Sequence, residues 1–188
     1  MFKINRQNYD TVIVGARCAG AFTSLHLARG GQRVLVIDRD RYGADTLSTH
    51  ALMRLGASLL DEANVLPQII AAGAPAVKET GFTYAGDRAA VDIIPKGRAE
   101  GLYAPRRSVL DRILVDAAKD AGATFIFQAC FEGLIRNADH RPVGVRIRMP
   151  DGAVHTVSCD TIVGAAGRHS AVATACGAQV THKGQNCS

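Results

Sequence analysis

The sequence lacks the features of a membrane-spanning or nucleic-acid-binding chain. Its 188 residues contain no tryptophan and only 5% aromatic residues, and its lysines and arginines are scattered rather than grouped with aromatic side chains. Nucleic acid is therefore a poor candidate partner, whereas the net charge of +5 suits a ligand that carries phosphates. The most apolar stretch, residues 11–28, is interrupted by Arg17 and His26, so no run of about 18 apolar residues could span a bilayer.

Cysteine is sparse, and its spacing is not that of metal ligands, so we predict no metal site. The number of cysteines, five, is odd, and the first four lie in apolar or helical surroundings: Cys18, Cys130, Cys159 and Cys176. This pattern predicts buried free thiols in a reducing compartment. Residues 1–8 are polar and have no apolar core, so they are not a signal peptide. We therefore expect a soluble cytoplasmic protein whose residues 1–8 form a flexible tail.

Residues 9–38 have the pattern of a strand, a glycine turn, a helix and a second strand. The β-branched run at 11–14 is typical of a buried parallel strand, and apolar residues then recur at helical spacing as far as Ala28. Gly30 and Gly31 end this helix. Asp38 closes the second strand 23 residues after Gly15, which is the layout of a dinucleotide-binding βαβ unit.

The turn at Gly15–Gly20 has residue types suited to a diphosphate. Gly15 permits a tight turn, Gly20 lets the helix pack closely against the strand, and the helix N-terminus offers N–H groups to an anion. Asp38 can accept hydrogen bonds from both hydroxyls of an adenosine ribose, which favours a ligand without a 2′-phosphate. However, Arg17 replaces the middle glycine of G-x-G-x-x-G. An ordinary strand–turn–helix of an α/β protein therefore remains the alternative.

The segment after Asp38 is charged and irregular, and it leads into a hydroxyl-rich stretch at 46–50. That stretch either caps a helix over about 51–62 or forms a lip over a bound cofactor. A short second helix is predicted within 65–77. Alternating residues at 82–94 then predict a β-hairpin with its turn at Gly86-Asp87.

The second half of the sequence begins with a helix from Ser108, its expected N-cap, to Gly122, followed by a short buried strand at 124–127. Arg106 and Arg107 precede this helix, either as a solvated pair or as a guanidinium placed to fork onto a phosphate or flavin ring edge. A three-stranded antiparallel meander is predicted at 131–136, 143–148 and 153–157. A buried strand at 160–164 then ends in a second small-residue turn, before a short helix to about Cys176.

These elements predict an α/β fold: a Rossmann-like parallel sheet of about four strands, with helices and a three-stranded β-meander crossover. Ligands bind such sheets at the carboxyl ends of the strands. We therefore expect the turns Gly15–Gly20 and Gly164–Ser170 to face the same crevice. No side chain is identified as a catalytic acid or base.

The order of these motifs resembles the FAD-binding half of flavin-dependent monooxygenases of the para-hydroxybenzoate hydroxylase type. The resemblance covers residues 9–178 and rests on the first turn, Asp38, the sequence DTLSTH at 45–50, Arg107-x-x-Leu110-x-x-x-Leu114 and the second turn. It implies an FAD-dependent oxidoreductase that uses NAD(P)H as reductant and acts on a small organic substrate.

The resemblance also implies the cofactor-binding residues: Gly15, Ala16, Cys18, Ala19, Gly20, Asp38, Arg39, Ser48, Thr49, His50, Arg107 and Gly167. It places the diphosphate on the helix after Gly15, the adenosine ribose on Asp38, and the flavin near Ser48–His50. Arg17 is expected to be a tolerated variant with its side chain directed away from the phosphates. At the second turn, Ala166 replaces the acid that the family usually has.

By the same resemblance, residues 9–176 form an FAD-binding domain, and residues 177–188 begin a C-terminal half that lies outside the sequence. The hairpin at 82–94 would join a substrate-side sheet in that half, so the C-terminal half or a second copy of the chain would cover its apolar face. The alternatives are a non-catalytic or degenerate FAD- or ADP-binding module, and a relative of flavin-dependent prenyl-chain reductases or halogenases. We expect little turnover from the chain alone.

Overall fold

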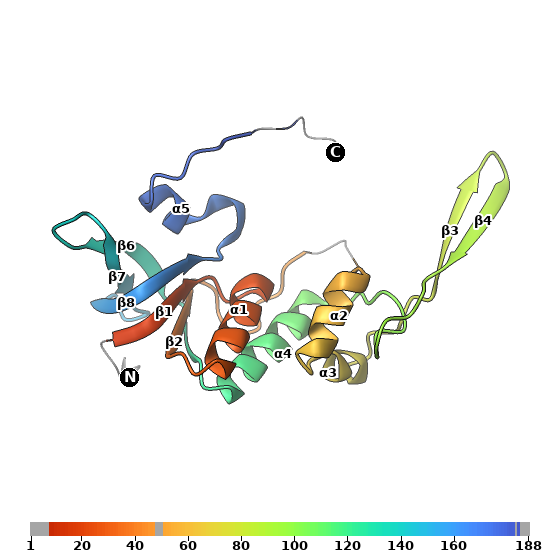
Figure 1. Cartoon of the computed structure of the whole chain (residues 1–188), viewed down its shortest axis with the longest axis horizontal. Helices are drawn as coiled ribbons and strands as arrows, with labels where there is room; N and C mark the ends of the chain where they lie inside the picture. The colour runs from red at the N-terminus through yellow and green to blue at the C-terminus, as the bar shows by residue number, and fades with distance from the viewer. Residues whose placement is uncertain (1–7, 48–50, 183, 185–188) are drawn as a thin grey trace. The chain divides into compact units, whose positions relative to one another are not determined.

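The computed structural model describes residues 8–47, 51–182 and 184. The chain forms two compact units, of which the first runs to Arg41 and resumes at Ala118, and the second spans Tyr42–Ala117. The elements, in chain order, are β1 (Asn8–Val14), α1 (Cys18–Arg29), β2 (Val34–Asp38), α2 (Arg54–Glu62), α3 (Leu66–Ala71), β3 (Glu79–Tyr84), β4 (Asp87–Asp92), α4 (Arg107–Asp120), β5 (Thr124–Phe127), β6 (Cys130–Arg136), β7 (Pro142–Arg148), β8 (Val154–Gly164), the 3-10 helix η1 (Gly167–His169) and α5 (Ala171–Ala175) (Figure 1).

The first unit is built on a six-stranded sheet with the strand order β5-β2-β1-β8-β7-β6. Strands β5, β2, β1 and β8 pair in parallel, whereas β8, β7 and β6 pair in antiparallel fashion. The predicted α/β fold, with four parallel strands and a three-stranded meander, is therefore confirmed.

One prediction within this sheet is wrong. The third meander strand and the returning parallel strand, expected as separate elements at 153–157 and 160–164, are a single strand, β8. Ser158 pairs with Gly144 of β7 on one side and with Asn8 of β1 on the other. Ser158 is therefore the point at which the strand exchanges β7 for β1 as its neighbour, while its backbone stays extended.

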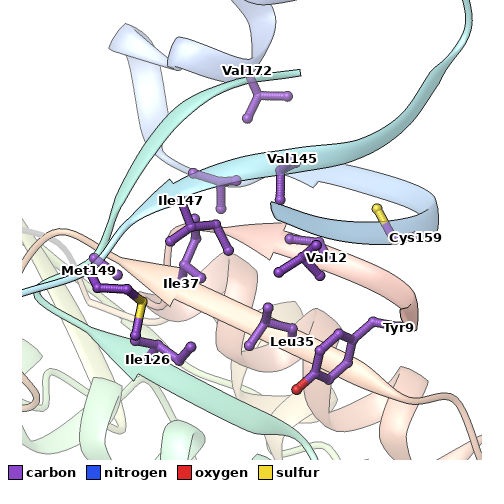
Figure 2. Close-up of a cluster of buried hydrophobic side chains, with 13 residues drawn as sticks. Tyr9, Val12, Leu35, Ile37, Ile126, Val145, Ile147, Met149, Cys159 and Val172 are labelled. Carbon is purple, nitrogen blue, oxygen red and sulfur yellow. The ribbon is translucent and has the colours of Figure 1, made fainter. Parts of the chain in front are cut away.

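β1 and β2 are largely buried, as strands of a parallel sheet covered on both faces are. The prediction of a buried strand at 160–164 is wrong, because that part of β8 is exposed or half-buried. Val12 and Ile37 point into a cluster that includes Val145 and Ile147 of the meander (Figure 2). On the opposite face Ile13 is also fully buried. Helix α1 packs against β1 and β2 and buries the residues whose spacing predicted it, namely Ala21, Leu25 and Ala28. As predicted, the helix ends at Gly30, and Gly31 has a φ of 82°.

The second unit contains the predicted helices α2 and α3, which bury Leu60, Leu66 and Ile69. It also contains the predicted hairpin, which Figure 1 shows as a narrow two-stranded ribbon. The turn lies one residue earlier than expected, at Ala85-Gly86, because the register pairs Tyr84 with Asp87. Ala85 and Gly86 have φ values of 50° and 94°, as the two central residues of a type I′ turn require.

The described cysteines are all free, but only Cys159 is buried. The prediction of buried thiols is wrong for Cys130 and Cys176, which are exposed. Cys130 begins β6, the last strand at one edge of the sheet, and Cys176 follows the short helix α5. Within residues 8–47, 51–182 and 184, no helix is both long and apolar enough to cross a membrane.

Candidate functional site

The first turn joins β1 to α1 through backbone that only glycine fits well. Gly15 has a φ of 111°, and a Cβ atom there would lie 2.6 Å from the carbonyl oxygen of Ala165. A Cβ atom on Gly20 would lie 1.7 Å from the carbonyl oxygen of Gly15. Gly20 is therefore required because the helix lies against the Gly15 backbone of the turn, and not because it packs against β1. Both glycines keep the end of β1 and the start of α1 in contact.

The second turn lies beside the first, at the same edge of the sheet. β8 pairs with β1 as far as Gly164 opposite Val14, and the Ala165 N–H donates to the Val14 carbonyl at 2.8 Å. The two turns therefore lie side by side, while the predicted crevice between them stays a prediction. Gly167 follows with a φ of 78° and open space around it. Ala166, which replaces the expected acid, is exposed.

Asp38 connects the first turn to the loop after β2. One carboxylate oxygen accepts a hydrogen bond from the Ala16 N–H at 2.6 Å, and the other accepts from the Asp40 N–H at 2.8 Å. The Asp38 side chain therefore fixes the turn as well as lying at the predicted ribose position. Each oxygen keeps a second lone pair for a further donor, because an ionised carboxylate accepts about four hydrogen bonds. Arg39, beside it, is exposed.

Arg17 stands between the strand end and the helix without strain. Its backbone is extended, with φ −80° and ψ −171°, and it is the residue from which α1 begins. Its guanidinium pairs with Asp40 at 2.9 Å across the loop that follows β2. The turn and this loop are thus connected by the Arg17–Asp40 pair in addition to Asp38.

In the second unit, Asp45 caps helix α4, for which the sequence predicted Ser108 as the N-cap. Helix α4 begins at Arg107, so Ser108 lies inside it, and the Ser108 N–H donates to the Asp45 carboxylate at 3.2 Å. The predicted N-cap is therefore wrong: a residue 63 positions earlier in the chain supplies the cap. The Arg106 guanidinium also pairs with Asp45 and holds the pKa of that carboxyl below its ordinary value.

Arg107, predicted to hold the cofactor, is engaged within its own helix. Its guanidinium contacts the buried Asp111 carboxylate one helical turn later, at 3.1 Å. A cleft of about 420 Å³ lies beside it. The cleft is lined by Asp45, Thr46, Leu47, Ala104, Pro105, Arg106 and Arg107. Ser48, Thr49 and His50 follow directly in the chain but lie outside the described residues, so their predicted place near a flavin stays a prediction.

A second cleft, of about 460 Å³, lies at the opposite end of β1. Asn8, Tyr9 and Arg33 are among its lining residues, and none of the predicted cofactor residues lines it. The two clefts therefore do not coincide with the turns.

The chemistry of the first turn suits an anion followed by a ribose. Helix α1 has no acidic residue in its first turn and no side-chain cap on its N-terminus, while Ala19 in that turn is exposed. A helix N-terminus of this kind favours a phosphate group. The carboxylate of Asp38 then lies beyond it, with capacity for hydroxyl donors. The described residues therefore fit the adenosine diphosphate part of a dinucleotide.

Sequence reasoning missed two residues that shape these regions, Asp40 and Asp45. Both lie in the charged segment after β2, where a carboxylate gives no sign of its partner. Asp40 pairs with a residue 23 positions away, and Asp45 caps a helix 63 positions away. The DTLSTH motif did include Asp45, but the pattern gave it no structural role.

Comparison with known proteins identifies the family. A family model described as an FAD binding domain matches residues 8–187. Protein FixC of Azorhizobium caulinodans is 27% identical over 179 residues, which are 89% of this chain and 39% of FixC. The myxobacterial chondrochloren halogenase CndH has the same fold, with a TM-score of 0.80 and 18% identity over 90% of this chain and 40% of CndH.

A further solved structure, the flavin-dependent monooxygenase PieE in complex with FAD and substrate, has a TM-score of 0.72 and 25% identity. That match covers 90% of this chain and 32% of PieE. The chain thus spans between 32% and 40% of the length of these relatives. Since the family model covers almost the whole sequence, the resemblance predicted from the motifs is confirmed, and the chain belongs to the FAD binding domain family.

Proposed function

We propose that this chain is the FAD-binding portion of a flavin-dependent monooxygenase that acts on a small organic substrate and takes electrons from NAD(P)H. The observation that carries the proposal is the pair of adjacent backbone turns at the carboxyl ends of β1 and β8. PieE, a flavin-dependent monooxygenase, matches 90% of this chain, which supports the choice of reaction class.

Different residues of the first unit would bind different parts of FAD. The N-terminus of α1 would receive the diphosphate, and Asp38 would accept hydrogen bonds from the ribose hydroxyls. Arg39, exposed beside Asp38, would lie along the adenosine. When bound, FAD supplies the electron transfer and oxygen chemistry, so the protein's part is binding, orientation and exclusion of water.

The second unit has a separate role in this proposal. Asp45 is fixed to the start of α4. Ser48–His50, which follow it in the sequence, are proposed to contact the flavin, and Arg107 would contribute a positive charge. The hairpin β3–β4 would pack on the substrate-side sheet of a C-terminal half or on a second copy of the chain.

We also place the protein in the cytoplasm, a reducing compartment, because the four described cysteines are free thiols.

A titration with FAD tests the proposal, with flavin fluorescence and the visible spectrum as readouts. We expect saturable binding, and we expect Asp38→Ala to weaken it by about 1–3 kcal/mol, the contribution of a charge-assisted hydrogen bond. Asp38→Asn keeps one acceptor and should lose less. Asp10→Ala, at the opposite end of β1, is the control and should bind FAD as the wild-type chain does. A wild-type chain that leaves the flavin spectrum unchanged would remove the proposed function.

A second candidate is a cofactor-binding module without turnover, and Ala166 favours it. This exposed alanine occupies the position where the family usually has an acid on the second turn. We expect Ala166→Asp to tighten FAD binding, because the new carboxylate could accept hydrogen bonds from cofactor hydroxyls. Equal affinity in the two proteins would mean that this turn does not contact the cofactor. NADH and NADPH oxidation by the FAD-loaded chain then separates an enzyme from a binding module.

A further inference from the structure

Among the three glycine positions of the G-x-G-x-x-G pattern, the one occupied by Arg17 is the one at which the structure does not require glycine. Its extended backbone is open to any residue, whereas Gly15 and Gly20 would each place a Cβ atom within 2.6 Å of a carbonyl oxygen. The arginine therefore replaces a glycine at no conformational cost. What it adds is a long cationic side chain at the N-terminus of α1.

The guanidinium is held on the ribose side of the turn by a fixed carboxylate. Arg17 Nη2 lies 2.9 Å from Asp40 Oδ2, and the two side chains are 36% and 41% exposed. Asp40 is held by its own backbone: its N–H donates to Asp38 at 2.8 Å, and its carbonyl accepts from Gln128 at 3.0 Å. Asp38 also accepts from Ala16 at 2.6 Å, so this one carboxylate contacts both the turn before α1 and the backbone of Asp40.

We propose that Arg17 is a ligand of the FAD diphosphate and that it exchanges the Asp40 carboxylate for a phosphate oxygen when the cofactor binds. The inference rests on the proposed function, since it assumes that a dinucleotide occupies this edge. It reverses the expectation that the side chain points away from the phosphates, because Asp40 holds the guanidinium beside Asp38. A guanidinium matches the geometry of a phosphate, and the diphosphate brings two charges where Asp40 offers one.

The exchange is favoured by the weakness of the pair that it breaks. A half-exposed ion pair contributes little to folding, because solvent screens both charges. The diphosphate would also gain from the positive end of α1. Asp40 therefore acts as a competitor for the Arg17 guanidinium before the cofactor arrives.

The test compares FAD, ADP and adenosine as ligands, with the first two followed by titration and adenosine by saturation-transfer NMR. We expect Arg17→Ala to weaken FAD and ADP binding tenfold or more, to leave adenosine binding unchanged, and to reduce the salt dependence of affinity. Arg17→Gly, which restores the usual glycine, should lose the same affinity. Asp40→Asn should tighten FAD binding several-fold, because it removes the competing charge.

The matched control is Arg33→Ala, which breaks the similar Arg33–Asp10 pair in the same unit. It should bind all three ligands as the wild-type chain does. FAD and ADP affinities that stay unchanged or rise in Arg17→Ala or Arg17→Gly would overturn the inference, as would an equal loss of adenosine binding. If the wild-type chain binds ADP through Arg17 but does not bind FAD, the contact between Arg17 and a diphosphate stands and the proposed function fails. If it binds neither ligand, both fail.

Discussion

The β1–β2 pair and the β3–β4 pair show two ways in which one chain stabilises strands. The residues of β1 and β2 are almost all buried, with Val12, Ile13 and Val36 fully inaccessible. In β3 and β4 nearly every side chain is exposed, including Phe82 at 62% and Tyr84 at 86%. The first pair is held by burial on both faces, and the second by its turn and its cross-strand contacts.

The difference shows that similar residue types do not imply similar energetic roles. In the hairpin, Thr80 pairs with Val91 and Phe82 with Ala89, and such cross-strand pairs contribute about 0.2–1 kcal/mol each. A two-stranded hairpin alone is only marginally stable in water. The sheet of the first unit should therefore govern global stability, while the hairpin should tolerate substitution.

The largest effect expected from this comparison is that of truncating a buried strand residue. Ile13→Ala should lower the free energy of unfolding by about 2–5 kcal/mol, because it removes buried methyl groups and leaves a cavity. Val91→Ala, at a β-branched position that is 53% exposed, should change it by no more than about 0.5 kcal/mol. Urea denaturation of the two variants measures both values. Similar losses would mean that the hairpin contributes to the cooperative core.

Replacing one glycine by alanine in each region, Gly20 in the βαβ unit and Gly86 in the hairpin, should give the next largest loss of stability. Gly20→Ala places a Cβ atom onto the Gly15 carbonyl, so the turn must open, with a loss of stability of about 1–3 kcal/mol and loss of FAD binding. Gly86→Ala meets no neighbouring atom and carries only the backbone strain of its φ of 94°, about 1–2 kcal/mol within the hairpin. FAD titration separates them, since Gly86→Ala should bind normally. Normal binding by Gly20→Ala would contradict the described turn.

Alkylation of cysteine thiols should distinguish the sheet of the first unit from the exposed hairpin, and it requires no substitution in the core. Burial raises the pKa of the Cys159 thiol in β8 to about 11, so at pH 8 it has almost no reactive thiolate. Iodoacetamide should modify Cys159 only on unfolding, whereas Val91→Cys should add a rapidly modified site in β4. Exposed Cys130 is an internal reference. Mass spectrometry over time measures each rate of modification. Equal rates for Cys159 and Cys130 would show that β8 opens readily around Cys159.

The smallest expected effect concerns the surface of the first unit. Arg33 hydrogen-bonds the Asp10 carboxylate and lowers its pKa from 3.8 to about 2. Since the folded pKa is the lower one, the stabilisation is present above about pH 4 and is lost as the pH falls toward 2. Asp10→Asn should therefore reduce the slope of stability against pH in that window. A slope identical to that of the wild-type chain would mean that the exposed pair is fully screened.

The sequence predicted the parts of the fold that depend on local pattern. Glycine turns, apolar periodicity and the terminal acid at Asp38 located the βαβ unit, and strand adjacency then placed the second turn beside it. The continuity of β8 was missed because a strand that changes neighbours at Ser158 alternates on one side of that residue and not on the other. The cap of α4 by Asp45 was missed because a side chain's distant partner leaves no periodic trace.

The pairing of β1 also has a consequence for synthesis on the ribosome. Its neighbour β2 follows within the βαβ unit, but its other neighbour, β8, pairs Val14 with Gly164, 150 residues later. Such a distant contact is slow to form, and it cannot form at all until that part of the chain has left the exit tunnel. Until then the nascent chain presents one unpaired edge of β1, a strand that is largely buried in the folded protein. β8, which is synthesised long after β1, therefore determines when β1 is protected from aggregation.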